Sequence, residues 1–249
     1  MTQTAVITDL HANRQALEAV LADAESKGIR NFAFLGDLVG YGADPGWVVD
    51  TVAALVEKGA AVAVMGNHDE AAVRGSTSTM RDEARQALDW THVQLDARQL
   101  AFLEHLPLTQ HVGDCLYVHA NAYAPKGWEY IQGRIEAMRS LHATPARYTF
   151  CGHMHEPMLY HLSGTGKAGD FKPVPGVAIP LLSHRQWLVI PGSCGQPRDG
   201  NPEACYAIFD REQQQLSFER VPYDAGEAAA RIRAAGLPER LADRLLLGQ

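Results

Sequence analysis

The stretch Ala5–His11, AVITDLH, runs from a short apolar, β-prone segment directly into Asp9 and His11, two side chains that can bind a metal. Two later apolar segments end in the same way, at Gly36-Asp37 and at Gly66-Asn67-His68-Asp69. In open α/β sheets, ligands bind outside the carboxyl ends of the strands. We therefore expect these polar residues, which are far apart in the sequence, to meet at one edge of a sheet.

Strand and helix signals alternate around these segments. Helical spacing of apolar residues follows the first strand, and a second helix is predicted over Pro45–Lys58, after which Gly59 marks its end. The region from Met80 to Leu106 is rich in helix, with a break near Leu95–Ala97. Repeated strand-helix-strand units predict an α/β fold with parallel strands.

The second half of the chain is richer in strands. A helix is predicted near Ile131–His142, and two short helices, Ala225–Ala235 and Glu239–Leu247, close the chain. Residues 163–185 are rich in Gly and Pro and form a long excursion, and excursions of this length are usually either functional or mobile. The strands predicted across the chain are Ala5–Thr8, Phe32–Leu35, Ala61–Met65, Cys115–Val118, Tyr148–Cys151, Met158–Leu162, Trp187–Ile190, Tyr206–Asp210 and Leu216–Arg220.

Composition restricts the class of protein. The chain has 249 residues, of which 46% are hydrophobic and 20% charged, as in an ordinary globular protein, and we expect a single domain over residues 1–249. A formal net charge of −7 argues against general nucleic-acid binding, which needs a basic surface. The four cysteines lack a CxxC spacing and are expected to be reduced thiols of a cytoplasmic protein. The start of the chain does not look like a signal peptide, and no apolar run is long enough to span a membrane.

Two later strands also end in histidines. Cys115–Val118 is followed by His119, and Tyr148–Cys151 is followed by His153 and His155. Buried imidazoles and carboxylates gathered without a cation would be costly, so the pattern favours a metal cluster. Asp, Asn and His without Cys suit Mn, Fe, Co, Ni or Zn, and seven ligands are too many for one tetrahedral ion but suit a pair. The candidate ligands are Asp9, His11, Asp37, Asn67, His119, His153 and His155.

Five motifs, in this order, resemble those of the calcineurin-like metallophosphoesterase superfamily: Asp9-Leu10-His11, Gly36-Asp37, Gly66-Asn67-His68-Asp69, His119 and Gly152-His153-Met154-His155. The chain further resembles a bacterial branch described as diadenosine-tetraphosphatase-like, in residues 36–42, in residues 191–200 and in the helical tail. The resemblance implies a four-layer α-β-β-α sandwich. It also implies hydrolysis of a phosphomonoester or phosphodiester, of a nucleotide or another small phosphorylated molecule, by a metal-bridging hydroxide at a dinuclear centre.

The resemblance also implies a role for each motif residue. Asp9, His11 and His155 would hold one ion, Asn67, His119 and His153 would hold the other, and Asp37 would bridge the two. His68 would act as general acid or stabilise the phosphoryl group, and Asp69 would orient His68 and support its charge. The chain departs from the branch at Ala120-Asn121 and at Ala12, which alters the expected shape of the substrate rim but no ligand.

Substrate contacts are predicted at three positions, each with an alternative. Asn13 and Tyr41 could hydrogen-bond a phosphate or nucleotide, although Asn13 could instead cap the following helix. Arg198 could bind phosphate or form an ion pair with Asp199. The basic residues of the 163–185 excursion could close over an anionic substrate, but a solvated surface loop is the simpler interpretation.

Other functions compete with this interpretation. A serine/threonine protein phosphatase would use the same metal cluster on a different substrate. A non-catalytic scaffold that keeps the fold would typically lack the histidine next to the metal-binding Asn, and this chain has His68 there. A metal-dependent nuclease is disfavoured by the net negative charge.

Overall fold

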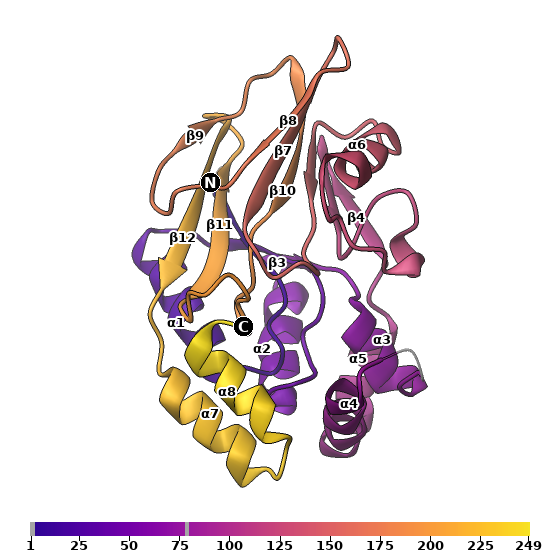
Figure 1. Ribbon diagram of the computed structural model, residues 1–249, viewed down its shortest axis with the longest axis vertical. Coiled ribbons are helices and arrows are strands. Elements are labelled where there is room, and N and C mark those ends of the chain that lie inside the picture. The colour runs from indigo at the N-terminus through magenta and orange to yellow at the C-terminus, as the bar shows by residue number, and fades with distance from the viewer. Residues whose placement is uncertain (1–2, 78–79) are drawn as a thin grey trace.

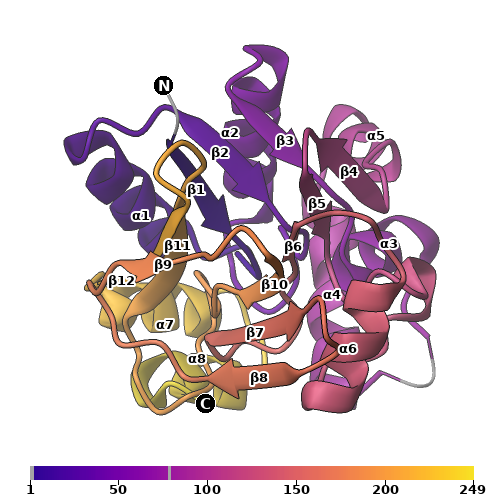
Figure 2. The ribbon, with the colours of Figure 1, turned by 90° about the horizontal axis from the view of Figure 1, so that it is seen from above.

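The computed structural model describes residues 3–77 and 80–249 of the chain, in which the strands form two six-stranded sheets (Figures 1 and 2). The first sheet has the strand order β3-β2-β1-β11-β12-β9, made of β1 (Gln3–Ile7), β2 (Asn31–Phe34), β3 (Ala61–Ala63), β9 (Ile179–Pro180), β11 (Ala204–Asp210) and β12 (Gln215–Val221). The second has the order β4-β5-β6-β10-β7-β8, made of β4 (Thr109–Val112), β5 (Cys115–Val118), β6 (Tyr148–Phe150), β7 (Met158–Ser163), β8 (Ala168–Phe171) and β10 (Arg185–Ile190).

Each sheet contains a run of three parallel strands. β1, β2 and β3 run parallel in the first sheet, and β5, β6 and β10 run parallel in the second. The remaining pairings, including β1 with β11 and β10 with β7, are antiparallel. The carboxyl ends of three neighbouring strands therefore meet at one edge of each sheet.

The helices complete a four-layer arrangement. α1 (Arg14–Ser26) and α2 (Pro45–Glu57) cover the outer face of the first sheet, and α6 (Arg134–His142) covers the outer face of the second (Figure 2). Alternate residues of one strand serve different layers: Ile7 packs under the helices, whereas Val6 lies in the core between the sheets. The α-β-β-α sandwich predicted from the resemblance is confirmed. Because both faces of the central strands are buried, these strands read as continuous apolar runs.

The other helices gather at the end of the molecule where the parallel strands finish (Figure 1). α7 (Ala225–Ala234) and α8 (Glu239–Leu247) pack against each other, with Ala87 of α4 in the same apolar cluster. The remaining helices are α3 (Asn67–Arg74), α4 (Asp82–Gln94), α5 (Ala97–Glu104) and the short 3-10 turn η1 (Pro125–Gly127). The predicted break near Leu95–Ala97 separates α4 from α5.

Elements that were not predicted from the sequence include α3, β4, β8 and β9, of which β4 pairs with β5 in the second sheet. α3 begins at Asn67, so the third motif is the first turn of a helix and not only a loop. The 163–185 excursion contains β8, which extends the second sheet beside β7, and β9, which pairs with β12 of the first sheet. This segment thus connects the outer edges of the two sheets. It lies far from the helices at the lower end of the molecule in Figure 1. Among the described residues, no helix is long and apolar enough to cross a membrane.

Candidate metal centre

All of the candidate metal ligands lie just beyond the carboxyl ends of parallel strands. Asp9 and His11 follow β1, Asp37 follows β2, and Asn67 follows β3. From the second sheet, His119 follows β5, and His153 and His155 follow β6. The backbone turns sharply at these points, with positive φ at Asp9, His11, Asp37, His153 and His155. These turns direct side chains from both sheets toward the same point.

Close backbone approach explains why glycine precedes the ligands. A Cβ atom at Gly66 would overlap the backbone N and the carboxylate of Asp37, and one at Gly152 would overlap the Thr8 hydroxyl. Gly66 therefore lets the ligand loops after β2 and β3 lie in contact, and Gly152 does the same for the loops after β1 and β6, which belong to different sheets.

The ligand atoms form two overlapping groups. The first contains Asp9, His11, Asp37 and His155, and the second contains Asp37, His119 and His153, with all ligand atoms of a group within 4.8 Å of one another. Asp37 belongs to both: its Oδ2 lies 3.7 Å from His11 Nε2 and 3.4 Å from His119 Nε2. Asn67 joins the second group, since its Oδ1 lies 3.1 Å from His119 Nε2. This is the partition that the resemblance implies.

One nitrogen of each ligand histidine is held by a backbone carbonyl. Nδ1 of His11, His119 and His155 donates to the carbonyl oxygens of Val39, Leu35 and Gln196, at 3.2, 2.7 and 2.7 Å. In His153 the roles are exchanged, because Nε2 donates to the carbonyl of Trp128 at 3.0 Å. A carbonyl only accepts, so the other nitrogen of each ring carries a lone pair whenever the imidazole is neutral, as a metal-binding imidazole is. Such carbonyl contacts commonly orient metal-binding imidazoles.

The free nitrogens face one another in pairs. His11 Nε2 lies 3.2 Å from His155 Nε2, and His119 Nε2 lies 3.1 Å from His153 Nδ1. Two lone pairs at this separation repel unless a proton or a metal ion lies between them, and nitrogens that each lie about 2.1 Å from one metal ion are about 3 Å apart. The donor set therefore fits a metal ion in each group.

The electrostatics of the buried cluster also favour cations. Burial raises the pKa of Asp9 to about 7. Burial would also raise the pKa of Asp37, but the charges of His119 and His68 outweigh it and hold that pKa well below its usual range. In turn, burial would lower the pKa of His119, but Asp37 raises it to about 9. Burial lowers the pKa of His153 to about 3. The carboxylates thus depend on nearby positive charge, which bound cations would supply.

His68 lies beside the ligands but belongs to neither group. Its backbone N–H donates to Asp37 Oδ1 at 2.8 Å, which leaves Oδ2 facing the histidines. Its imidazole is 5% exposed and packs against Tyr41, with ring centres 4.5 Å apart, and against His11 at 5.0 Å. Nδ1 of His68 has no hydrogen-bond partner among the described residues. The structure thus places an uncommitted imidazole next to the metal-ligand cluster, as expected for a proton donor to substrate.

Asp69 does not orient His68, so that prediction is wrong. The Asp69 carboxylate accepts hydrogen bonds from the backbone N–H groups of Leu38, Val39 and Gly66, at 2.8, 3.2 and 2.9 Å. It therefore caps the start of α3 and ties the loop after β2 to that helix. Both oxygens of the Asp69 carboxylate accept hydrogen bonds from backbone N–H groups. The position of His68 therefore depends on packing instead.

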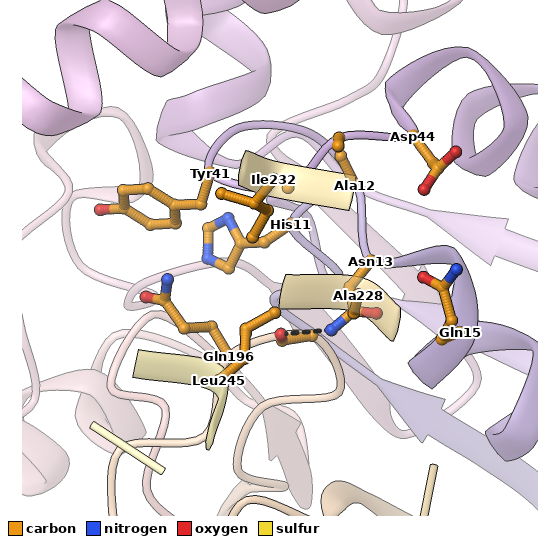
Figure 3. Close-up of a pocket in the computed structure, with 13 residues that line it drawn as sticks. His11, Ala12, Asn13, Gln15, Tyr41, Asp44, Gln196, Ala228, Ile232 and Leu245 are labelled. Atoms are coloured by element: carbon orange, nitrogen blue, oxygen red, sulfur yellow. Dashed lines mark hydrogen bonds between the residues drawn. The ribbon is translucent and has the colours of Figure 1, made fainter. Parts of the chain in front are cut away.

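Of the three predicted substrate contacts, Asn13 caps a helix, whereas Tyr41 and Arg198 line a cleft. Asn13 caps α1, because its Oδ1 accepts from Ala16 N at 3.1 Å and its Nδ2 donates to the carbonyl of Gly195 at 2.8 Å. The pocket beside Asn13 has a volume of only about 10 Å³, at most one water, and is closed by Ala228, Ile232 and Leu245 (Figure 3). The structure therefore resolves the alternatives for Asn13 in favour of the cap.

Arg198 faces the site and does not pair with Asp199. Its guanidinium donates to Gln196 Oε1 at 2.9 Å and lies 5.9 Å from the ring centre of Tyr41. Asp199 instead forms an ion pair with Arg220. Arg198 and Tyr41 both line a cleft of about 880 Å³ that also contains Asn67, His68 and His153. No residue of the 163–185 excursion lines this cleft, so the interpretation as a lid over the substrate is wrong.

Several cleft residues were not found from the sequence. They come from α3, from α4, from the segment around η1 and from α8, and they include Trp128, Tyr130, Arg81 and Arg244. None of them directly follows a predicted strand, which was the signal that identified the ligands. Arg244 sits in an amphipathic tail helix, where a charged residue normally indicates a solvated face.

Comparisons with known proteins agree with this geometry. Residues 3–214 match the family described as the calcineurin-like phosphoesterase superfamily domain. An uncharacterized protein of Methanocaldococcus jannaschii is 34% identical over 251 residues, which cover 98% of each chain. The crystal structure of a metallophosphoesterase from Sphaerobacter thermophilus has 38% identity and a TM-score of 0.86, over 100% of this chain and 99% of that one. A hypothetical protein from Pyrococcus horikoshii, at 20% identity with the same coverage and a TM-score of 0.79, shares the fold.

Proposed function

The chain belongs to the calcineurin-like phosphoesterase superfamily, and from this premise we propose that it hydrolyses a phosphomonoester or phosphodiester of a small molecule at a dinuclear metal centre. The observation that carries the proposal is the pairing of imidazole nitrogens around Asp37, whose carboxylate faces both groups of ligands. Asp9, His11 and His155 would hold one transition-metal ion, Asn67, His119 and His153 would hold the other, and Asp37 would bridge them. Two such ions supply a nucleophilic hydroxide near neutral pH and neutralise phosphoryl charge.

The remaining chemistry belongs to the chain's own side chains. His68 lines the cleft, so its imidazole would donate a proton to the leaving-group oxygen or a hydrogen bond to the phosphoryl group, while its Nδ1 is buried beside Gly40. Arg198 would bind a phosphoryl oxygen, because its guanidinium lines the same cleft and has no carboxylate partner among the described residues. Tyr41 packs against both His11 and His68 and would help to fix the position of both imidazoles.

The setting of His68 also favours a catalytic protein over a non-catalytic scaffold with the same fold. A scaffold has no need for a buried imidazole that contacts the bridging carboxylate through its backbone and opens onto a cleft. A protein phosphatase would require the same cluster, so only the substrate separates that alternative from a small-molecule phosphoesterase. Single-domain organisation over residues 1–249 stays a prediction.

Replacement of the bridging carboxylate tests the proposal. Asp37→Asn should reduce hydrolysis of p-nitrophenyl phosphate and of bis(p-nitrophenyl) phosphate by at least about a thousandfold, because the metal bridge loses a charged ligand. Metal content measured by emission spectroscopy should fall from two ions per chain. Asp114→Asn is the matched control, because the Asp114 carboxylate pairs with Arg211 away from the cluster. This variant should retain both the hydrolytic activity and the two metal ions. Full activity in Asp37→Asn would refute the site assignment.

A further inference from the structure

The arginines of the cleft differ from most others in this chain. Most arginines form an ion pair with a carboxylate, for example Arg240 with Glu83 at 3.2 Å. In the part of the chain that the structure describes, the arginines without such a partner are Arg81, Arg147, Arg185, Arg198 and Arg244. Arg81, Arg198 and Arg244 all line the cleft next to His68. In the described part of a chain with a net charge of −7, three of the five unpaired guanidinium groups thus lie in the cleft beside the proposed metal centre.

The arginines come from three separate parts of the fold. Arg198 follows β10, Arg81 directly precedes α4, and Arg244 lies in α8. Arg198 and Arg244 are close enough for their charges to interact, since burial and then the charge of Arg198 lower the pKa of Arg244. Like charges repel, so an arrangement in which neither guanidinium forms an ion pair is costly in the free protein. An anionic ligand would remove that cost.

α8 presents Arg244 from a fixed position. Leu241, Ala242 and Leu245 of this helix are buried in the cluster that also contains Ala87 of α4. Arg244 is therefore not on a loose tail, and its reach into the cleft is set by packing. Arg240, one turn earlier on α8, is engaged with Glu83 and does not line the cleft.

The cleft also carries flat aromatic groups. Tyr130 stacks on the ring of His153, with centres 4.0 Å apart and planes inclined by 12°. Trp128 is held by a hydrogen bond from its Nε1 to Glu70 at 3.0 Å, and Glu70 also pairs with Arg74 at 2.8 Å. Arg74 is thus neutralised although it lines the same cleft. The positive charge that remains free is that of Arg81, Arg198 and Arg244.

One phosphoryl group at the metal-ligand cluster does not account for all of this charge. A phosphoryl group under hydrolysis would be neutralised by the metal ions and Arg198. Arg81 and Arg244 lie outside the metal-ligand set, and guanidinium groups bind phosphate through paired hydrogen bonds. Their placement in the cleft calls for a second anionic group on the same substrate.

We propose that Arg244 and Arg81 form an anionic subsite, adjoining Arg198, that binds a second phosphoryl group of the substrate and so selects substrates with two or more phosphoryl groups. This inference rests on the proposed phosphoesterase function. The second group could be joined to the first as an anhydride or carried elsewhere on the molecule as a separate ester, and both present the same dianionic oxygens.

Competition against p-nitrophenyl phosphate hydrolysis by the metal-loaded protein tests the subsite. Adenosine 5′-monophosphate, adenosine 5′-diphosphate and adenosine 3′,5′-bisphosphate differ only in the presence and place of the second phosphate. A competing substrate inhibits with its own KM, so the assay works whether or not these nucleotides are cleaved. In the wild type, at least one of the two bisphosphorylated nucleotides should inhibit about tenfold or more tightly than the monophosphate. Which of the two does so identifies the linkage.

Variants assign the effect to the arginines. Arg244→Ala should remove most of that preference, and Arg81→Ala should reduce it. Arg240→Ala loses the same charge from the same helix and should keep both the preference and kcat for p-nitrophenyl phosphate. Calorimetric binding of the nucleotides to metal-loaded His68→Asn, with and without Arg244→Ala, gives the same comparison without turnover.

The outcomes separate the two proposals. Equal inhibition by all three nucleotides in the wild type, or an undiminished preference in Arg244→Ala, would overturn the subsite while leaving the phosphoesterase intact. An equal loss of the preference for bisphosphorylated nucleotides in Arg240→Ala would also overturn the subsite, because net charge would then explain binding. Absence of p-nitrophenyl phosphate hydrolysis together with tight bisphosphate binding would instead reject the proposed function and keep the subsite.

Discussion

Replacing Gly40 with Ala should disable His68 without disturbing the metal ligands. Gly40 has φ +88°, and a Cβ built there would overlap His68 Nδ1 and lie 3.1 Å from its Cγ. Because non-bonded heavy atoms approach to about 3.5 Å, the imidazole or the loop must move by about 1 Å. The nearest atoms to this Cβ all belong to His68, so the ligand side chains are not displaced directly.

Two effects contribute to the result and can be estimated separately. Alanine at positive φ costs about 1–2 kcal/mol of stability, and overpacking adds about 1–3 kcal/mol. Activity should fall further, because a misplacement of about 1 Å at a catalytic group can lower the rate by about a hundredfold. We expect kcat for p-nitrophenyl phosphate to drop by this factor while two metal ions remain bound.

A matched variant separates strain from displacement of His68. Gly28 has φ +79° and no atom within 4 Å of a built Cβ, so Gly28→Ala carries the backbone strain alone. It should lose about 1–2 kcal/mol of unfolding free energy in a urea titration and keep its kcat. Normal kcat in metal-loaded Gly40→Ala, or an equal loss of kcat in Gly28→Ala, would refute the argument that packing positions His68.

Further predictions concern the cap and the metals. Asp69→Ala leaves the buried backbone N–H groups of Leu38, Val39 and Gly66 without acceptors. It should lower the free energy of unfolding in urea by about 2–4 kcal/mol, more than His68→Ala does. Equal losses of unfolding free energy in the two variants would argue against the capping role. Removal of metal by a chelator should lower Tm by several degrees, because ligands that bind only the native state stabilise it. An unchanged Tm after verified metal loss would contradict the assignment of the buried cluster as a metal site.

The ligands could be predicted from the sequence because each directly follows a strand. Parallel strands end at a common edge, so the position of a polar residue in the sequence also gives its place in the fold. Nothing comparable identifies Arg244, whose place in the cleft depends on how α7 and α8 pack against Ala87. The resemblance also implied the wrong partner for Asp69: Asp37 meets the other ligands, whereas Asp69 meets backbone donors and not His68. That difference arises from α3, which begins at Asn67 and was not predicted.

The conformations of the ligand loops link folding to metal binding. In the described chain, every non-glycine residue with positive φ except Gln214 lies at the ligand cluster or lines one of the two pockets next to it: Asp9, His11, Ala12, Asp37, Tyr41, Trp128, His153 and His155. Such residues cost about 1 kcal/mol or more each, and they persist only where the surrounding structure fixes them. Here the apolar cores on both faces of the sheets supply that constraint. They hold the ligand loops in backbone conformations that these non-glycine residues do not favour. Metal ions bound by the converging imidazoles and carboxylates would offset both the strain and the crowding of charges, so chelation should affect the stability of the whole fold.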